Sequence, residues 1–255
     1  MRLQALPALR DNYIWVLSRD GADAVVVDPG ESGPVLAAVA TAGLRPAAIL
    51  LTHHHPDHVG GAAALLARWP DLPVFAPDDA RIPVSARRVR DGDVVAAAGW
   101  QFEVIEVPGH TTSHVAYVGH GIVFSGDTLF SLGCGRLFEG TPAQMTASLS
   151  RLASLPGETL VCCGHEYTLS NAAFAHAVDP HNEALRRRTE EARAMRDAGR
   201  PSVPSTVANE CAANPFLRSD APAVVDAVAA RLGRPPADRV ETFAELRRWK
   251  DGFAA

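Results

Sequence analysis

The sequence predicts an α/β domain at residues 1–167 followed by a smaller, all-helical domain at residues 168–255. Short apolar runs alternate with helical patterns through the first third of the chain, which is typical of an α/β arrangement. From Val94 onward, strand-like segments follow one another closely. Beyond about residue 168 the strand patterns give way to charged, amphipathic helical ones, so we expect a change of domain there.

Turn and helix-stop residues set the expected bounds of the first elements. Asp28-Pro29-Gly30 ends an apolar strand, and Gly43 ends the helix that follows. A second apolar strand then leads into a polar, histidine-rich turn and another helix. The expected elements are strand 24–27, helix 34–42, strand 47–51, helix 62–69 and strand 73–75.

The rest of the chain is divided by the same kinds of signal. Gly119-His120-Gly121 predicts a hairpin turn, and Thr141 followed by Pro142 predicts a helix start. A proline-containing stretch, 199–205, is expected to be a loop. The expected elements are strands 101–107, 115–118 and 122–125, helix 141–155, strand 159–163, and helices 183–198, 221–232 and 239–250.

Composition limits the classes of function. The chain has 255 residues, of which 47% are hydrophobic, and a formal net charge of −5, so we expect a globular protein that does not bind nucleic acid. No apolar run approaches the length of a membrane span and the N-terminus lacks a secretory pattern, so we expect a cytoplasmic protein without membrane association. The four cysteines are expected to be reduced and packed, although a metal role for Cys134, Cys162 or Cys163 is an alternative.

Four histidines and one aspartate lie in the string T-H-H-H-P-D-H at 52–58, between a predicted strand and a predicted helix. His53 and His55 are two residues apart, so they leave an extended chain on one face, whereas His54 faces away. Pro56 suits the first helical position and would place Asp57 and His58 in the first turn. A chance cluster in a polar loop is the alternative. Two ligand pairs that different elements direct to one point favour a metal site.

Further ligand-type residues follow later predicted strands: His110 in P-G-H-T, Asp127 in S-G-D-T and His165 in C-G-H-E. With the first cluster they make five imidazoles and two carboxylates, about the number that two adjacent divalent ions need. Asp28 is expected to hold a ligand in place. The expected arrangement puts His53, His55 and His110 on one ion, Asp57, His58 and His165 on the other, and Asp127 between them.

As a set, these strings resemble the metallo-β-lactamase superfamily. Within it the chain is similar to glyoxalase II, the hydroxyacylglutathione hydrolase family, in L-G-C-G-R at 132–136, C-G-H-E-Y-T at 163–168, N-P-F-L-R at 214–218 and L-R-R-W-K-D at 246–251. The likeness extends over nearly the whole chain. It implies a four-layer αβ/βα sandwich of two mixed β-sheets, a binuclear metal site, and a C-terminal helical domain that helps bind glutathione.

The resemblance also implies which residues contact the substrate. Arg136, Tyr167, Arg247 and Lys250 match glutathione-contacting positions, and Phe138 stands where the family often has a tyrosine. Arg136 replaces the usual lysine and can bind a carboxylate through two N–H groups, whereas Phe138 lacks the phenol hydroxyl.

The expected reaction is hydrolysis of the thioester of S-(2-hydroxyacyl)glutathione, such as S-lactoylglutathione, to glutathione and a 2-hydroxy acid, as in methylglyoxal detoxification. A hydroxide between two divalent ions about 3.5–4 Å apart is available at neutral pH, and Asp57 and Asp127 are the expected catalytic residues that hold it in place. We expect two zinc ions per chain, with iron or manganese as alternatives. The expected partner is a small-molecule glutathione thioester, and the expected oligomeric state is a monomer.

Three other functions are open. A glutathione persulfide dioxygenase of the same superfamily needs one iron, so the second ligand set counts against it. A nuclease would use similar metals, but the acidic balance counts against that activity. A non-catalytic metal protein would have closed four-ligand sites, whereas this set leaves room for water.

Overall fold

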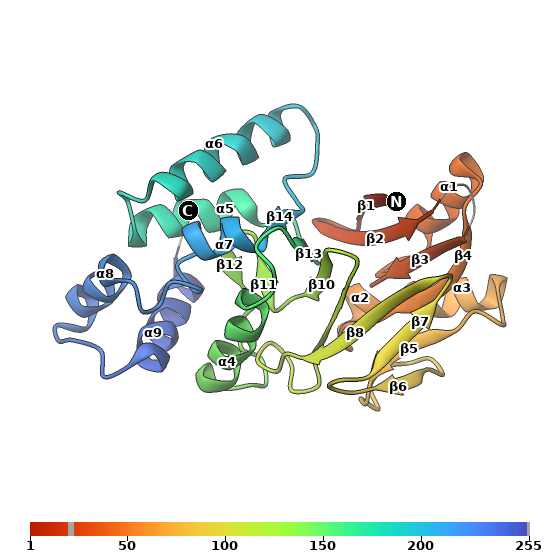
Figure 1. The fold of residues 1–255 in the computed structure, drawn as a ribbon, viewed down its shortest axis with the longest axis horizontal. Coiled ribbons are helices and arrows are strands. Elements are labelled where there is room, and N and C mark those ends of the chain that lie inside the picture. Colours follow the sequence, from red (N-terminus) through yellow and green to blue (C-terminus); the bar gives the residue numbers. More distant parts are fainter. Residues whose placement is uncertain (20–22, 254–255) are drawn as a thin grey trace. The chain divides into compact units, whose positions relative to one another are not determined.

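The structure is a computed structural model that describes residues 1–19 and 23–253. Its residues form two compact units, each made from separate stretches of chain (Figure 1). Unit 1 consists of Met1–Glu106, Ser113–Gly126 and Cys162–Glu166. Unit 2 consists of Val107–Thr112, Asp127–Val161 and Tyr167–Ala255.

Unit 1 contains a mixed sheet whose strand order is β1-β2-β3-β4-β5-β6. The first three strands are antiparallel, and β3 to β6 are parallel. Every residue of β2 is buried, so this strand has no polar face to reveal it as a strand. The strands are β1 Arg2–Ala8, β2 Asn12–Ser18, β3 Asp23–Val27, β4 Arg45–Leu50, β5 Val74–Pro77 and β6 Arg87–Val89.

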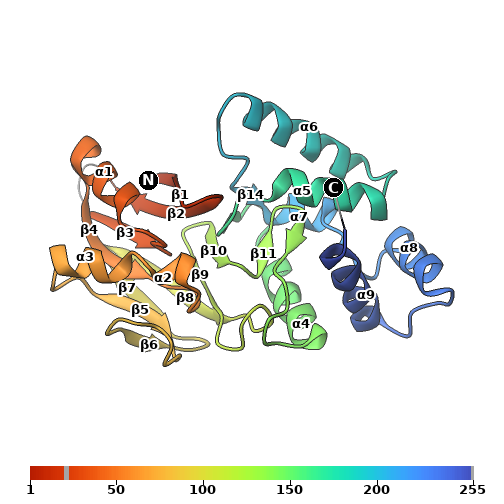
Figure 2. The same ribbon diagram turned by 180° about the vertical axis from the view of Figure 1, so that it is seen from behind.

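Helices of unit 1 pack on this sheet (Figure 2). They are α1 Gly33–Ala42, the single turn α2 Pro56–Val59, and α3 Ala62–Arg68. Val35 of α1 and Leu65 of α3 belong to one buried cluster with strand residues such as Ile49. Gly43, at the end of α1, takes the left-handed conformation that its position predicts.

A second sheet of unit 1 contains the antiparallel strands β7 Val94–Ala97, β8 Trp100–Glu106, β9 Val115–Gly119 and β10 Ile122–Gly126, in the order β10-β9-β8-β7. β13, Leu160–Cys163, lies beside β10. The buried Tyr117 of β9 donates its hydroxyl hydrogen to the carbonyl oxygens of Leu51 and Phe75, at 2.9 and 3.2 Å. This contact ties the second sheet of unit 1 to the chain of the first sheet.

Unit 2 is mainly helical. Its strands are short: β11 Leu129–Phe130 and β12 Gly133–Cys134 form a hairpin, and β14 Ser205–Thr206 pairs with Leu160 and Val161. Buried phenylalanines, including Phe174, Phe216 and Phe243, contact one another in its core. The helices are α4 Pro142–Ala153, α5 Thr168–Val178, α6 Glu183–Asp197, α7 Val207–Ala213, α8 Pro222–Leu232 and α9 Arg239–Asp251.

The elements that the sequence predicts are all present, with small shifts at their ends. Thr141 caps α4 as predicted, and Gln144 completes a capping box. Several elements are additional to the prediction: strands β1, β2, β6, β7, β11 and β12 and helices α5 and α7. The expectation that strands end near residue 168 is wrong, because β14 adds a two-residue strand at the end of the predicted 199–205 loop.

Candidate metal centre and substrate site

The histidine-rich turn of unit 1 has the backbone that its sequence predicts. Pro56 is the first residue of α2, so Asp57 and His58 lie in a helical turn, while His55 is extended. Two glycines let this turn touch the chain after β3: a Cβ at Gly30 would lie 2.0 Å from the carbonyl oxygen of Asp57, and one at Gly60 would lie 2.6 Å from that of Gly30. Side chains at these positions would force the ligand turn away from the sheet.

Hydrogen bonds fix which nitrogen of His53 carries the proton. The Thr52 hydroxyl donates to Asp28 Oδ2 at 2.7 Å, and Asp28 Oδ1 accepts the Thr52 N–H at 2.8 Å. Because its single proton goes to the carboxylate, the hydroxyl accepts from His53 Nδ1–H at 3.0 Å. The lone pair of His53 is therefore on Nε2, which lies 3.1 Å from Nδ1 of His55.

A second group of donors consists of Asp57, His58 and His165, whose ligand atoms lie within 4.8 Å of one another. Asp57 Oδ2 is 3.6 Å from His58 Nε2 and 3.4 Å from His165 Nε2. The other ring nitrogens face carboxylates: His58 Nδ1 lies 3.0 Å from Asp28, and His165 Nδ1 lies 2.7 Å from Asp11. A carboxylate behind each imidazole is the usual outer support of a metal-binding histidine.

These separations fit divalent metal ions. Two nitrogens bound at about 2.0–2.1 Å in tetrahedral geometry lie about 3.3 Å apart. The observed distances of 3.1 Å between His53 and His55, and of 3.4 and 3.6 Å around Asp57, bracket that value. Neutral imidazoles with a carboxylate are a donor set for zinc, iron or manganese.

His110 and Asp127, two of the predicted ligands, lie beside one another in unit 2. His110 Nδ1 lies 2.9 Å from the carbonyl oxygen of Arg136, which can only accept, so the Nδ1–H donates and Nε2 carries the lone pair. That Nε2 lies 3.5 Å from Asp127 Oδ2. Gly135 allows this arrangement, because a Cβ there would lie 1.9 Å from the Asp127 carbonyl oxygen.

Three further residues surround the cluster. Asp28 orients Thr52 and His58, as expected. His54 is directed to Asp79, with Nδ1 3.4 Å from the carboxylate. His114 stacks on His53, with ring centroids 4.6 Å apart.

Sequence reasoning missed two supporting residues, Asp11 in the turn between β1 and β2 and Asn12 at the start of β2. Asp11 accepts from His165, and Asn12 donates to Asp57 Oδ2 at 3.0 Å. The backbone joins the same places, since Glu166 N–H donates to Asp11 and Tyr13 N–H to Gly164. The polar sequence Arg10-Asp11-Asn12 could have indicated these two residues, but only if β1 and β2 had been recognised as strands.

Positive charges gather at the end of α9 in unit 2. Arg136 is exposed, with Nε 3.6 Å from Asp251 Oδ1. Lys250 donates to the Ser170 carbonyl oxygen at 2.9 Å and lies over the ring of Phe174. Partial burial, together with repulsion from Arg247 and Arg136, lowers the pKa of Lys250 from 10.5 to about 8. A cation under this repulsion is a good partner for an anion.

Arg247 differs from the exposed cation that its helix position suggests. Only 5% of it is exposed, and its guanidinium donates to the Cys134 carbonyl oxygen at 2.8 Å and to Asp251 at 3.1 Å. It also lies over the ring of Phe216. Burial raises the pKa of the neighbouring Cys134 thiol to about 11, so this cysteine is a packed, neutral group. All four cysteines are free.

The aromatic candidates for substrate contact also lie in unit 2. Phe138 is 63% exposed, its ring centroid is 5.2 Å from that of His110, and its N–H donates to the His110 carbonyl oxygen. Tyr167 precedes α5 and packs its ring edge-on against Phe130 at 5.3 Å. Phe138 therefore presents an apolar face beside a proposed metal ligand.

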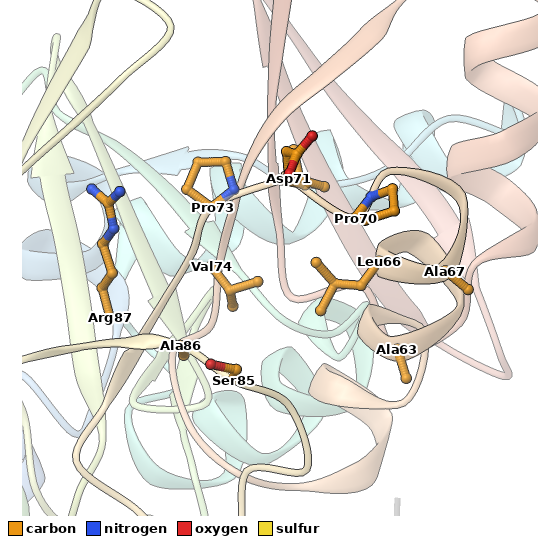
Figure 3. A pocket seen from close by; sticks show the side chains of 11 residues that line it. Ala63, Leu66, Ala67, Pro70, Asp71, Pro73, Val74, Ser85, Ala86 and Arg87 are labelled. Atoms are coloured by element: carbon orange, nitrogen blue, oxygen red, sulfur yellow. The ribbon is translucent and has the colours of Figure 1, made fainter.

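Unit 1 also has an open depression of about 600 Å³ between α3, β5 and β6 (Figure 3). Leu66 and Val74 point toward one another in it, and Asp71 and Arg87 lie among its lining residues. None of the predicted site residues lines it. The depression is therefore a feature separate from the metal ligands.

Comparison with known proteins identifies the superfamily to which the fold belongs. Residues 9–165 match the model of the metallo-beta-lactamase superfamily, and residues 166–253 match the hydroxyacylglutathione hydrolase C-terminus. The structure of ETHE1 from Myxococcus xanthus matches with a TM-score of 0.68 at 24% identity, covering 99% of this chain and 91% of that one. The fold is that of the metallo-β-lactamase superfamily, and it binds divalent metal through its histidine and aspartate clusters. The predicted fold class is confirmed.

Curated relatives narrow the class. A hydroxyacylglutathione hydrolase of Xanthomonas campestris pv. campestris is 60% identical over 255 residues, covering 100% of both chains. One from Xylella fastidiosa is 56% identical, covering 99% of this chain and 98% of its own. The structure titled TTHA1623 in a di-iron-bound form is 35% identical, with a TM-score of 0.54, covering 65% of this chain and 92% of that one. The chain belongs to the hydroxyacylglutathione hydrolase family.

Among residues 1–19 and 23–253, no helix combines the length and apolar character that crossing a lipid bilayer requires.

Proposed function

We propose that this chain hydrolyses the thioester of S-(2-hydroxyacyl)glutathione, with S-lactoylglutathione as a substrate. The observation that carries the proposal is the set of carboxylate-supported imidazoles around Asp57, in a chain whose 60%-identical relatives are named hydroxyacylglutathione hydrolases. The products are glutathione and a 2-hydroxy acid. A thiolate leaves readily, so the reaction needs no dedicated acid.

We infer that the site binds two divalent metal ions, and we propose zinc as the metal. Asp57, His58 and His165 would hold one ion, and His53 with His55 and His110 the other, while Asp127 would bridge. Chain continuity supports including the two unit 2 residues: Asp127 directly follows Gly126 of unit 1, and the stretch Val107–Thr112 is joined at both ends to unit 1. Such ions lower the pKa of bound water and polarise a carbonyl group.

The protein's contribution is to hold neutral imidazoles in fixed positions. Asp28 and Asp11 accept the Nδ1 protons of His58 and His165, so both Nε2 lone pairs face Asp57. Thr52 does the same for His53. A ligand set oriented in this way does not have to reorganise when metal or substrate arrives.

We infer that Lys250 and Arg136 bind the carboxylates of glutathione. Repulsion from neighbouring arginines makes Lys250 a good partner for an anion, and Arg136 is an exposed cation whose Nε lies 3.6 Å from Asp251 Oδ1. Arg247 supports them from within unit 2, because its own donors are occupied by Cys134 and Asp251. Tyr167 is the proposed polar neighbour, and Phe138 contributes apolar contact only. The partner is then a small molecule, and we propose a cytoplasmic monomer that binds neither nucleic acid nor membrane.

Incubation of metal-assayed protein with S-lactoylglutathione tests the proposal. Loss of the thioester absorbance, dependent on metal and absent in Asp127→Asn, is the expected result. Oxygen uptake with glutathione persulfide, measured on the same preparation, distinguishes the dioxygenase. Persulfide oxidation with no thioester loss would overturn the proposal.

A further inference from the structure

The hairpin β11–β12 has a turn that needs support from outside. Leu129 pairs with Cys134 and Phe130 with Gly133, which leaves Ser131 and Leu132 to make the turn. Leu132 has a φ of 60°, in the left-handed region that residues other than glycine rarely adopt. Such a conformation persists only where the surrounding structure determines it.

Helix α7 and the residue that ends it provide much of that support. Glu210 Oε2 accepts the Leu132 N–H at 2.7 Å. Asn214 Nδ2 donates to the carbonyl oxygens of Phe130 and Gly133, at 3.2 and 3.0 Å, and also lies 3.1 Å from Glu210 Oε2. Neither Glu210 nor Asn214 has any exposed surface, so these bonds are shielded from water.

Helices α5 and α6 hold the other half of the turn. Asn171 Nδ2 donates to the Ser131 carbonyl oxygen at 3.1 Å, and Arg188 reaches the Ser131 hydroxyl at 3.2 and 3.3 Å. The Leu132 side chain belongs to a buried cluster that includes Ala172. The turn is therefore enclosed by side chains that all come from helices after residue 167.

The two proposed ligands of unit 2 lie at the open end of this hairpin. Asp127 and Thr128 directly precede β11, and the Gly135 N–H donates to the Thr128 carbonyl oxygen at 3.2 Å. Arg136 follows, and its carbonyl oxygen accepts the His110 Nδ1 proton. Any movement of the hairpin changes the orientation of both His110 and Asp127.

We propose that Glu210 is a positioning residue for metal binding: through Leu132 it fixes the hairpin that aims His110 and Asp127. This inference rests on the proposed role of those two residues as ligands. The helical part of the chain then has a second task besides substrate binding, because it determines the geometry of two of the three proposed metal ligands that lie outside the histidine-rich turn.

Metal retention measured without substrate tests the proposal. Zinc-loaded protein is mixed with a chromogenic chelator, and the rate of zinc transfer is compared among variants. Glu210→Met leaves the buried Leu132 N–H without its acceptor and should release zinc at least about tenfold faster, whereas Glu210→Gln keeps an acceptor oxygen and should stay close to wild type. Thr189→Val is the matched control, since Thr189 is buried in α6 and bonds only to Leu185 and His176 among the contacts described.

The outcomes separate positioning from general stability. Fast release by Glu210→Met with slow release by Thr189→Val supports the proposal. Equal release from Glu210→Met and wild type overturns it, as does equally fast release from both variants. If Glu210→Met does not fold, Asn171→Ala, which removes only the donor to Ser131, decides in the same assay. Since no substrate is present, failure of the thioester hydrolase proposal would leave this result unaffected.

Discussion

Lys250 offers the sharpest test of how the substrate is recognised. It is partly buried, lies near two arginines and has a pKa lowered to about 8, so an incoming anion should stabilise its positive charge. A charge-assisted hydrogen bond contributes about 1.5–3 kcal/mol. At the lower figure, suited to a partly exposed group, Lys250→Met should raise KM roughly tenfold. The value of kcat should hardly change, because the contact is remote from the thioester and acts equally in ground and transition states.

The same residue predicts a pH dependence. Only protonated Lys250 attracts a carboxylate, so the KM of wild type should rise as the pH passes about 8, toward the value for Lys250→Met. Lys250→Arg keeps its charge in this range and should show a flatter profile. Steady-state kinetics between pH 6.5 and 9.5, corrected for spontaneous thioester hydrolysis, measures both effects.

Two results would refute this reasoning. One is a KM for Lys250→Met that equals the wild-type value at pH 7. The other is a pH profile for Lys250→Arg that matches wild type, which would assign the titration to the substrate or to another residue. Added salt provides a control, because screening should raise the wild-type KM more than that of Lys250→Met.

Three further predictions concern other residues. Arg247→Ala removes the donor to the buried Cys134 carbonyl oxygen and should lower the free energy of unfolding by about 2–3 kcal/mol. Urea unfolding should show this loss as a lower midpoint, and the loss should exceed that from replacing an exposed arginine. Asp127→Asn should lose zinc and hydrolysis together, and normal metal content by atomic absorption would contradict the bridging role. The Arg81 hydrogen bond holds the pKa of Asp79 well below its usual 3.8. The ionised carboxylate therefore stabilises the fold fully above pH 3.8, and this stabilisation is lost as the pH falls toward the lowered pKa. Asp79→Asn should for this reason flatten the decline of Tm between about pH 5 and 2.

The sequence predicts the ligand turn because its geometry is local. Pro56 starts the helical turn, and the spacing of His53 and His55 depends only on the extended chain between them. The outer support is not local: Asp11 binds His165 across 154 residues, and neither residue type indicates its partner. Long-range pairs of this kind appear only once the strands are assembled.

Burial explains two other differences between the predicted and the observed structure. All seven residues of β2 are buried, so the alternation that marks a half-exposed strand is missing. Arg247 follows the pattern of a surface helix, but its guanidinium meets a carbonyl oxygen 113 residues earlier in the chain. A charged residue on an amphipathic helix is usually exposed, and this exception depends on Cys134 offering an acceptor.

The enclosed Ser131–Leu132 turn has a consequence for synthesis on the ribosome. The chain is synthesised from its N-terminus. The strands of the first sheet of unit 1, which end at Val89, are therefore made well before the residues that enclose the turn. Asn171, Arg188, Glu210 and Asn214 are all made later than the hairpin they hold. We expect the nascent hairpin to stay unfolded, with its hydrophobic strands exposed to solvent, until about residue 214 has left the exit tunnel. Ribosome-bound chains stopped before and after that length should differ sharply in protease cleavage near residue 132.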